Sequence, residues 1–179
     1  MDIRKQLSLA ASRVAEHYFA LPVAGRDKPL LRERVYCYEL YHQLRCILPH
    51  DTQLVLTAEP DKRSNPSFTQ GRPIPDFIFH KPGSHVQNSA VIEVECRVNR
   101  PHLRKDLCTF RCLQEKGYQQ FILLLFGVKT VPWNTLSQVV YEVGMQLDQI
   151  SVLLHAEAGS MAYLQELPTG TVPRKSGTE

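Results

Sequence analysis

Apolar residues recur with the period of an α-helix in four segments of the chain. These segments are residues 7–20, 30–47, about 101–116 and about 133–147. Proline and glycine mark their limits: Pro49 closes the second segment, Pro101 fits the first turn of the third, and Gly117 stops it. The pattern therefore predicts four helices, two of them before the first strand.

Six shorter segments carry β-strand patterns. They are residues 53–58, 74–80, 89–96, 120–126, 150–156 and 161–167, the last two as a possible hairpin around residues 158–160. The run at 120–126 is apolar without alternation, which is typical of a central strand covered on both faces. The order α-α-β-β-β-α-β-α, with a possible C-terminal β-hairpin, predicts an α/β fold in which helices flank a central mixed sheet.

Length and composition are those of one ordinary globular domain. The chain has 179 residues, of which 43% are hydrophobic, and a net charge of +3. We expect a single domain over residues 1–167 and a disordered tail over 168–179. The loop at 60–73, rich in proline and polar residues, is expected to be poorly ordered.

The five cysteines and the lack of long apolar runs bear on location. Their number is odd and no Cys-x-x-Cys pair occurs, which favours buried free thiols in a reducing cytoplasm. No apolar run approaches the roughly 18 residues of a membrane helix. The first residues lack the apolar region of a signal peptide. We therefore expect a cytoplasmic protein.

Three carboxylates interrupt two neighbouring strand patterns. Asp76 begins the strand at 74–80, and Glu93 and Glu95 share one face of the strand at 89–96. Acids are poor strand formers, and carboxylates on adjacent strands are a common way to hold a hard divalent cation. Such a cation serves phosphodiester hydrolysis. The alternative is a solvated strand face whose acids pair with nearby arginine or lysine.

This stretch resembles the PD-(D/E)XK nuclease superfamily, whose fold is the restriction-endonuclease-like one. Pro75-Asp76 matches the first half of the motif and Glu93-Val94-Glu95 the second, with Glu95 in place of the usual lysine. The resemblance covers roughly residues 30–126. It implies that Asp76, Glu93 and the carbonyl of Val94 bind Mg2+ (or Mn2+), and that Glu95 orients or deprotonates the attacking water.

Two further residues enter through the same resemblance. In several members the lysine has moved to another element, and Lys105 on the next helix is a candidate for that role, or else a plain surface lysine. Glu39 resembles the acid that an N-terminal helix contributes, although it is equally consistent with a solvated glutamate at the edge of the apolar stripe.

Basic residues gather after the second motif. Arg97, Arg100, Arg104 and Arg111 are candidates for contacts with nucleic-acid phosphates, against the alternative of a charged solvated helix face. His102, one of four flanking histidines, could act as a general base, although a core or surface role is commoner.

The sequence thus favours a metal-dependent nuclease that acts on DNA, either as a homodimer or as a subunit of a larger complex. The main alternative is a catalytically inactive nuclease-fold module that binds nucleic acid or a protein partner. The missing lysine is the best argument for that alternative.

Overall fold

The computed structural model describes residues 2–49, 53–60, 73–83 and 87–168. Its α-helices are α1 (Ile3–Ala11), α2 (Glu16–Phe19), α3 (Glu33–Ile47), α4 (Arg100–Gln114) and α5 (Trp133–Glu142). Its strands are β1 (Val55–Ala58), β2 (Phe77–His80), β3 (Asn88–Glu95), β4 (Gln120–Phe126), β5 (Ile150–His155) and β6 (Tyr163–Leu164). A short 3-10 helix, η1 (Leu147–Gln149), precedes β5.

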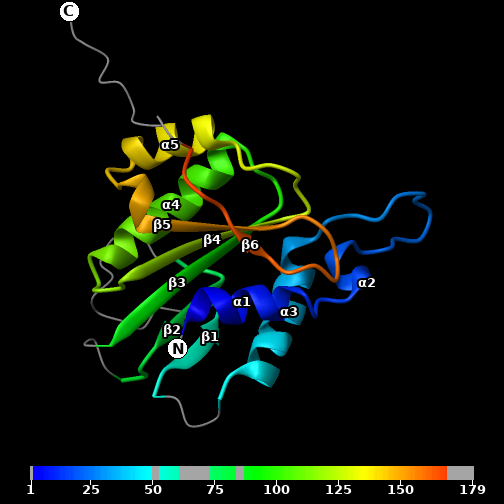
Figure 1. Cartoon of the computed structure of the whole chain (residues 1–179), viewed down its shortest axis with the longest axis horizontal. Helices are drawn as coiled ribbons and strands as arrows, with labels where there is room; N and C mark the ends of the chain where they lie inside the picture. Colours follow the sequence, from blue (N-terminus) through cyan, green and yellow to red (C-terminus); the bar gives the residue numbers. More distant parts are fainter. Residues whose placement is uncertain (1, 50–52, 61–72, 84–86, 169–179) are drawn as a thin grey trace, which may run out of the picture.

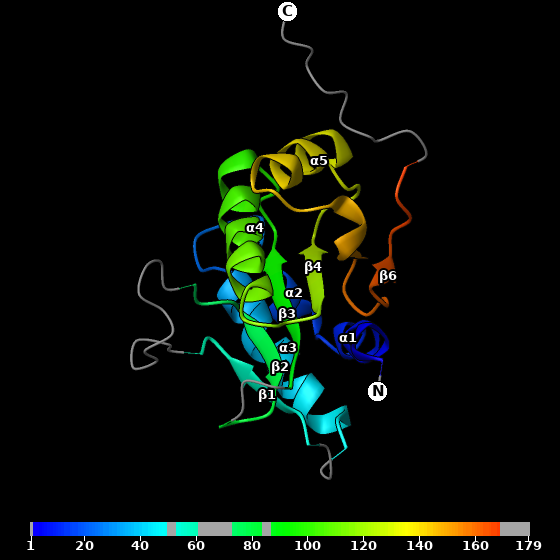
Figure 2. The same ribbon diagram turned by 90° about the vertical axis from the view of Figure 1, so that its left-hand side faces the viewer.

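In the described part of the chain, the six strands form one mixed sheet in the order β1-β2-β3-β4-β5-β6. The inner pairs β3–β4 and β4–β5 are parallel, and the outer pairs are antiparallel. Helices α1, α2 and α3 pack on one face, and α4 and α5 pack on the other (Figures 1 and 2). The predicted α/β architecture with a central mixed sheet and flanking helices is confirmed at this level.

Alternation along the strands builds two apolar layers. In β3 and β4, Ile92 and Leu124 face α1 and α3, whereas Val91 and Leu123 face α4 and α5. Strand β4 is buried from Phe121 to Phe126, as its continuous apolar run predicts. The odd-numbered face of β3 that carries Glu93 and Glu95 is therefore the face covered by α4.

The predicted limits of two helices were wrong. The segment at 7–20 is divided into α1 and α2, because Ala15 has an extended backbone between them. Helix α1 also begins earlier, at Ile3, where the Asp2 carboxylate accepts hydrogen bonds from the backbone of Arg4 and Lys5. Helix α5 ends at Glu142, because Gly144 adopts a φ of 73° and Met145 N donates to the Val140 carbonyl, the pattern of a glycine-terminated helix.

The C-terminal hairpin is present, since β5 and β6 pair antiparallel, but β6 is much shorter than the predicted 161–167. The predicted loop at 60–73 lies almost entirely outside the described residues, and so does the predicted tail beyond residue 168.

The structure bears on two further predictions, the absence of a membrane helix and the burial of the cysteines. Within the described residues, no helix is both long and apolar enough to cross a bilayer. Among the described residues, only Cys37 of the five cysteines is buried; Cys96 and Cys112 are half-buried and Cys46 and Cys108 are exposed, so the prediction of buried thiols was wrong for Cys46 and Cys108 and only partly met for Cys96 and Cys112.

Candidate functional site

The carboxylates predicted from the sequence meet where β2 begins and β3 ends. The antiparallel register pairs Phe77 with Ile92, so Asp76, one residue before β2, lies beside Glu93. The backbone N–H of Asp76 donates to Glu93 Oε2 at 3.4 Å, and the N–H of Val94 donates to Asp76 Oδ2 at 2.7 Å. The structure therefore brings Asp76, Glu93 and the backbone of Val94 together.

The burial of Glu93 excludes a solvated strand face at this position. The residue is 1% exposed, and no described residue offers a hydrogen-bond partner to its Oε1. Burial raises the pKa of Glu93 well above its usual range, and the charges of Asp76 and Asp106 raise it further. Burial likewise raises the pKa of Asp76, against the lowering effect of its bond from Val94.

Glu95 is also buried, at 3% exposure, but its oxygens are occupied. Oε1 accepts hydrogen bonds from the backbone N–H groups of Cys96 and Arg97. Oε2 lies 2.6 Å from Nδ1 of His102, which α4 supplies. The alternative of a solvated strand face paired with arginine or lysine is thus wrong for both glutamates, since Glu95 pairs with a histidine and with backbone.

Helix α4 adds two neighbouring charges. Lys105 Nζ lies 3.7 Å from Asp106 Oδ1. Burial opposes the charged form of Lys105, but the charges of Asp106, Glu93 and Asp76 outweigh it and raise the pKa of Lys105. Asp106 is buried, and burial raises its pKa to about 8 although the charge of Lys105 opposes the shift. The ammonium group of Lys105 therefore lies within the field of the carboxylate cluster.

The acid that α3 brings to the cluster is Glu33 rather than Glu39. Glu39 accepts a hydrogen bond from Gln43 at 2.7 Å, and the structure shows no contact between Glu39 and the cluster. Burial raises the pKa of Glu33 to about 7, with further contributions from the charges of Asp76 and Glu95. A sequence signal for Glu33 exists, since it precedes Cys37 by four residues on the buried stripe of α3.

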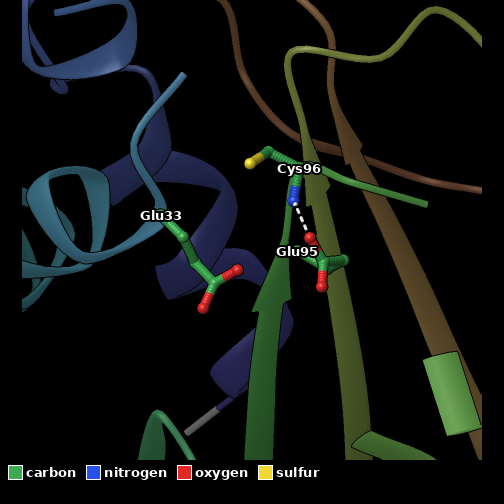
Figure 3. Close-up of side chains that lie close together, drawn as sticks. All are labelled: Glu33, Glu95 and Cys96. Atoms are coloured by element: carbon green, nitrogen blue, oxygen red, sulfur yellow. Dashed lines mark hydrogen bonds between the residues drawn. The ribbon is translucent and has the colours of Figure 1, made fainter. Parts of the chain in front are cut away.

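A second set of possible ligand atoms adjoins the first. One atom each from Glu33, Glu95 and Cys96 lie within 4.8 Å of one another, which is close enough for a shared metal ion. Figure 3 shows the Glu33 carboxylate reaching from α3 toward the end of β3, where Glu95 accepts the Cys96 backbone bond. This donor set mixes a thiol with carboxylates, whereas Asp76, Glu93 and the Val94 carbonyl offer only oxygen.

The four predicted phosphate-binding arginines fall into two groups. Arg100 and Arg104 both pair with Glu142 of α5, and Arg111 pairs with Glu115 at 3.2 Å. Arg97 is exposed and lines a cavity beside the cluster, together with Glu33, Cys96 and His102. The structure thus places only Arg97 of the four next to the carboxylates.

The comparisons with known proteins give no relative: no family model matches the chain, and no curated protein sequence matches it.

Proposed function

We propose that this protein is a metal-dependent nuclease of the PD-(D/E)XK type, with the restriction-endonuclease-like fold, that hydrolyses DNA phosphodiester bonds. The observation that carries the proposal is the pairing of half-buried Asp76 with buried Glu93, in which Glu93 Oε1 has no partner among the described residues. Two ionised carboxylates this close repel each other, and a divalent cation would remove that repulsion.

The donor set fits Mg2+ or Mn2+. Asp76, Glu93 and the Val94 carbonyl supply oxygen atoms, which hard cations prefer, and the site lies next to a cavity that a substrate can enter. A cation bound there would polarise a phosphoryl oxygen and lower the pKa of a bound water.

The other residues of the cluster have roles set by their contacts. Glu95, in contact with His102, would orient the attacking water and pass its proton toward the imidazole. Lys105 supplies a positive charge beside Glu93 and Asp76, which would stabilise the negative charge that develops on phosphorus oxygens. Lys105 thus takes over the charge that the motif lysine provides in the family.

One observation favours the alternative of an inactive nuclease-fold module that binds nucleic acid or a protein partner. Both oxygens of Glu95 already accept hydrogen bonds within the protein, so Glu95 is less available to a water molecule than a free base. In that module the carboxylate cluster would bind a cation without turnover.

The test is cleavage of plasmid and oligonucleotide DNA by the purified chain with Mg2+ or Mn2+, and with EDTA as the blank. We expect cation-dependent cleavage by the wild type and none by Asp76→Asn. Glu39→Gln is the matched control, because the Glu39 carboxylate accepts a hydrogen bond from Gln43 on the same helix and lies outside the carboxylate cluster. If the wild type cleaves neither DNA nor RNA with either cation, the enzyme proposal fails and the binding module stands.

A further inference from the structure

A cavity of about 570 Å3 opens beside the carboxylate cluster, between the first turns of α3 and the segment after β3. Glu33 belongs to both the cavity and the carboxylate cluster. It lines the cavity, and the charges of Asp76 and Glu95 raise its pKa. Whatever occupies this cavity therefore lies next to the candidate catalytic groups.

Exposed arginines line part of the cavity. Arg32, Arg34 and Arg97 line it, and all three are exposed. Arg34 pairs with Glu59, whereas Arg32 and Arg97 have no ion-pair partner among the described residues. This contrasts with α4, where Arg100 and Arg104 share an ion pair with Glu142. The free guanidinium groups make the cavity a better place for phosphates than the outer face of α4.

The remaining wall of the cavity is apolar and aromatic. Leu21, Leu31 and Val35 line it, and Tyr38 stands 61% exposed on α3. A duplex buries its base faces in its own stack and presents sugar and phosphate to such a wall. An unpaired strand presents bases that stack on aromatic rings and contact apolar side chains.

We infer that this cavity, which we call the α3 groove, binds an unpaired single strand of nucleic acid and delivers its phosphodiester to the carboxylate cluster. Arg32 and Arg97 contact phosphates, and Tyr38 stacks on a base. The inference deepens the proposed nuclease function by naming the substrate class, and rests on it for the role of the adjoining carboxylates.

The experiment measures binding rather than cleavage. Fluorescence anisotropy of a labelled oligothymidylate, and of a duplex of the same length, is titrated with the full chain in EDTA over a range of salt. We expect tighter binding of the single strand, and a loss of about tenfold in affinity on Tyr38→Ala, because one base stack is removed. Tyr38→Phe keeps the ring and retains the affinity.

Matched controls separate the α3 groove from general surface effects. Tyr141 on α5 is 62% exposed, so Tyr141→Ala removes an equally exposed ring elsewhere and leaves affinity unchanged. Arg32→Ala and Arg97→Ala each weaken binding and reduce the slope of log affinity against log salt by about 0.7, the value for one phosphate contact on a single strand. Melting of each variant by circular dichroism confirms its fold.

Three outcomes overturn the inference. The first is that the single strand does not bind. The second is that Tyr38→Ala and Arg32→Ala bind the single strand as tightly as the wild type. The third is that the duplex binds more tightly than the single strand and that these variants do not change this preference. Cleavage by the wild type is assayed separately. Cation-dependent cleavage with Tyr38-independent binding refutes the α3 groove but keeps the nuclease, whereas Tyr38-dependent binding without cleavage refutes the nuclease and keeps the groove.

Discussion

Two regions of this molecule bury polar side chains against opposite faces of the same sheet, and their electrostatics differ. On the α3 face, the Tyr36 hydroxyl lies 2.7 Å from His155 Nδ1, and the Tyr36 ring stacks on Phe126 at 4.0 Å between centroids. On the α4 face, Glu93 is buried beside Asp76 and Asp106, each of which is itself an acid.

The contrast shows what distinguishes a candidate site from a structural contact. An orphan atom alone does not, because His155 Nε2, like Glu93 Oε1, has no hydrogen-bond partner among the described residues. Burial lowers the pKa of His155 to about 4, so this side chain is neutral and costs little. On the other face several acids lie together, and their raised pKa values show that ionising all of them is costly, an arrangement that stability alone disfavours and that a cation site would require.

The largest expected difference between the two regions is in activity. Glu93→Gln should lower cation-dependent DNA cleavage by at least about a hundredfold. Even the loss of a residue that hydrogen-bonds to a metal ligand commonly lowers metal affinity or activity by about ten- to a hundredfold. Tyr36→Phe keeps the ring stack and leaves cleavage within about twofold of the wild type once the fold is intact. Equal losses in the two variants would mean that Glu93 acts through the fold.

Stability should respond in the opposite sense. Tyr36→Phe removes the partner of buried His155 Nδ1 and should lower the free energy of unfolding by about 1–3 kcal/mol. Glu93→Gln removes a buried acid from among acids and should leave stability unchanged or raise it in the absence of cations. Urea denaturation in EDTA measures both, and a marked loss in Glu93→Gln would identify Glu93 as part of a structural ion pair.

The pH dependence of stability separates the two regions again. The folded-state pKa of Asp106 is raised from 3.8 to about 8, so its contribution declines as pH rises from about 4 to about 8. The pKa of His155 is lowered from 6.5 to about 4, so its contribution is present above pH 6.5 and is lost as pH falls toward 4. The two trends oppose each other below pH 6.5.

Glu33, whose pKa is raised to about 7, and Glu93, whose pKa is raised well above its usual range, also contribute to the decline, so the comparison with Asp106→Asn isolates the share of Asp106. Asp106→Asn should make that decline shallower and make the loss of stability that His155 causes between pH 6.5 and 4 easier to see. Urea denaturation at several pH values without cations makes the measurement. A decline above pH 7 that persists unchanged in Asp106→Asn would show that Asp106 is not responsible.

The smallest expected effect distinguishes two acids of one helix. Glu33→Gln should weaken Mn2+ binding by roughly tenfold, as loss of a group around a metal site commonly does. Glu39→Gln, six residues along α3, should leave the affinity unchanged because its carboxylate accepts a hydrogen bond from Gln43 rather than facing the cluster. Isothermal titration with Mn2+ compares them, and the reverse order of effects would return the role to Glu39.

The sequence predicted most strands and the α/β arrangement because their signals are local. The alternation in β3 and the continuous apolar run of β4 depend only on which faces are covered. The break between α1 and α2 was missed, because apolar residues continue across Ser12–Ala15 at nearly helical spacing. Ala15 itself is exposed, while Val14 before it and Phe19 after it are buried, and the break that accompanies this burial leaves no signal in the period.

The site was predicted where its residues lie on strands and missed where they come from helices. Asp76, Glu93 and Glu95 stood out as acids in apolar strand patterns. Glu33 and Asp106 were overlooked, although each acid lies on a buried helical stripe, Asp106 four residues before Phe110. The burial of Glu95 and its contact with His102 depend on how α4 packs on β3. The spacing of residues along the sequence does not reveal this packing.

Diffraction from crystals soaked in Mn2+ tests the central claim most directly, because the anomalous signal locates the ion. We predict a manganese peak between the carboxylates of Asp76 and Glu93 that is absent in crystals of Glu93→Gln. A peak only among Glu33, Glu95 and Cys96, or no peak at a saturating concentration, would contradict it.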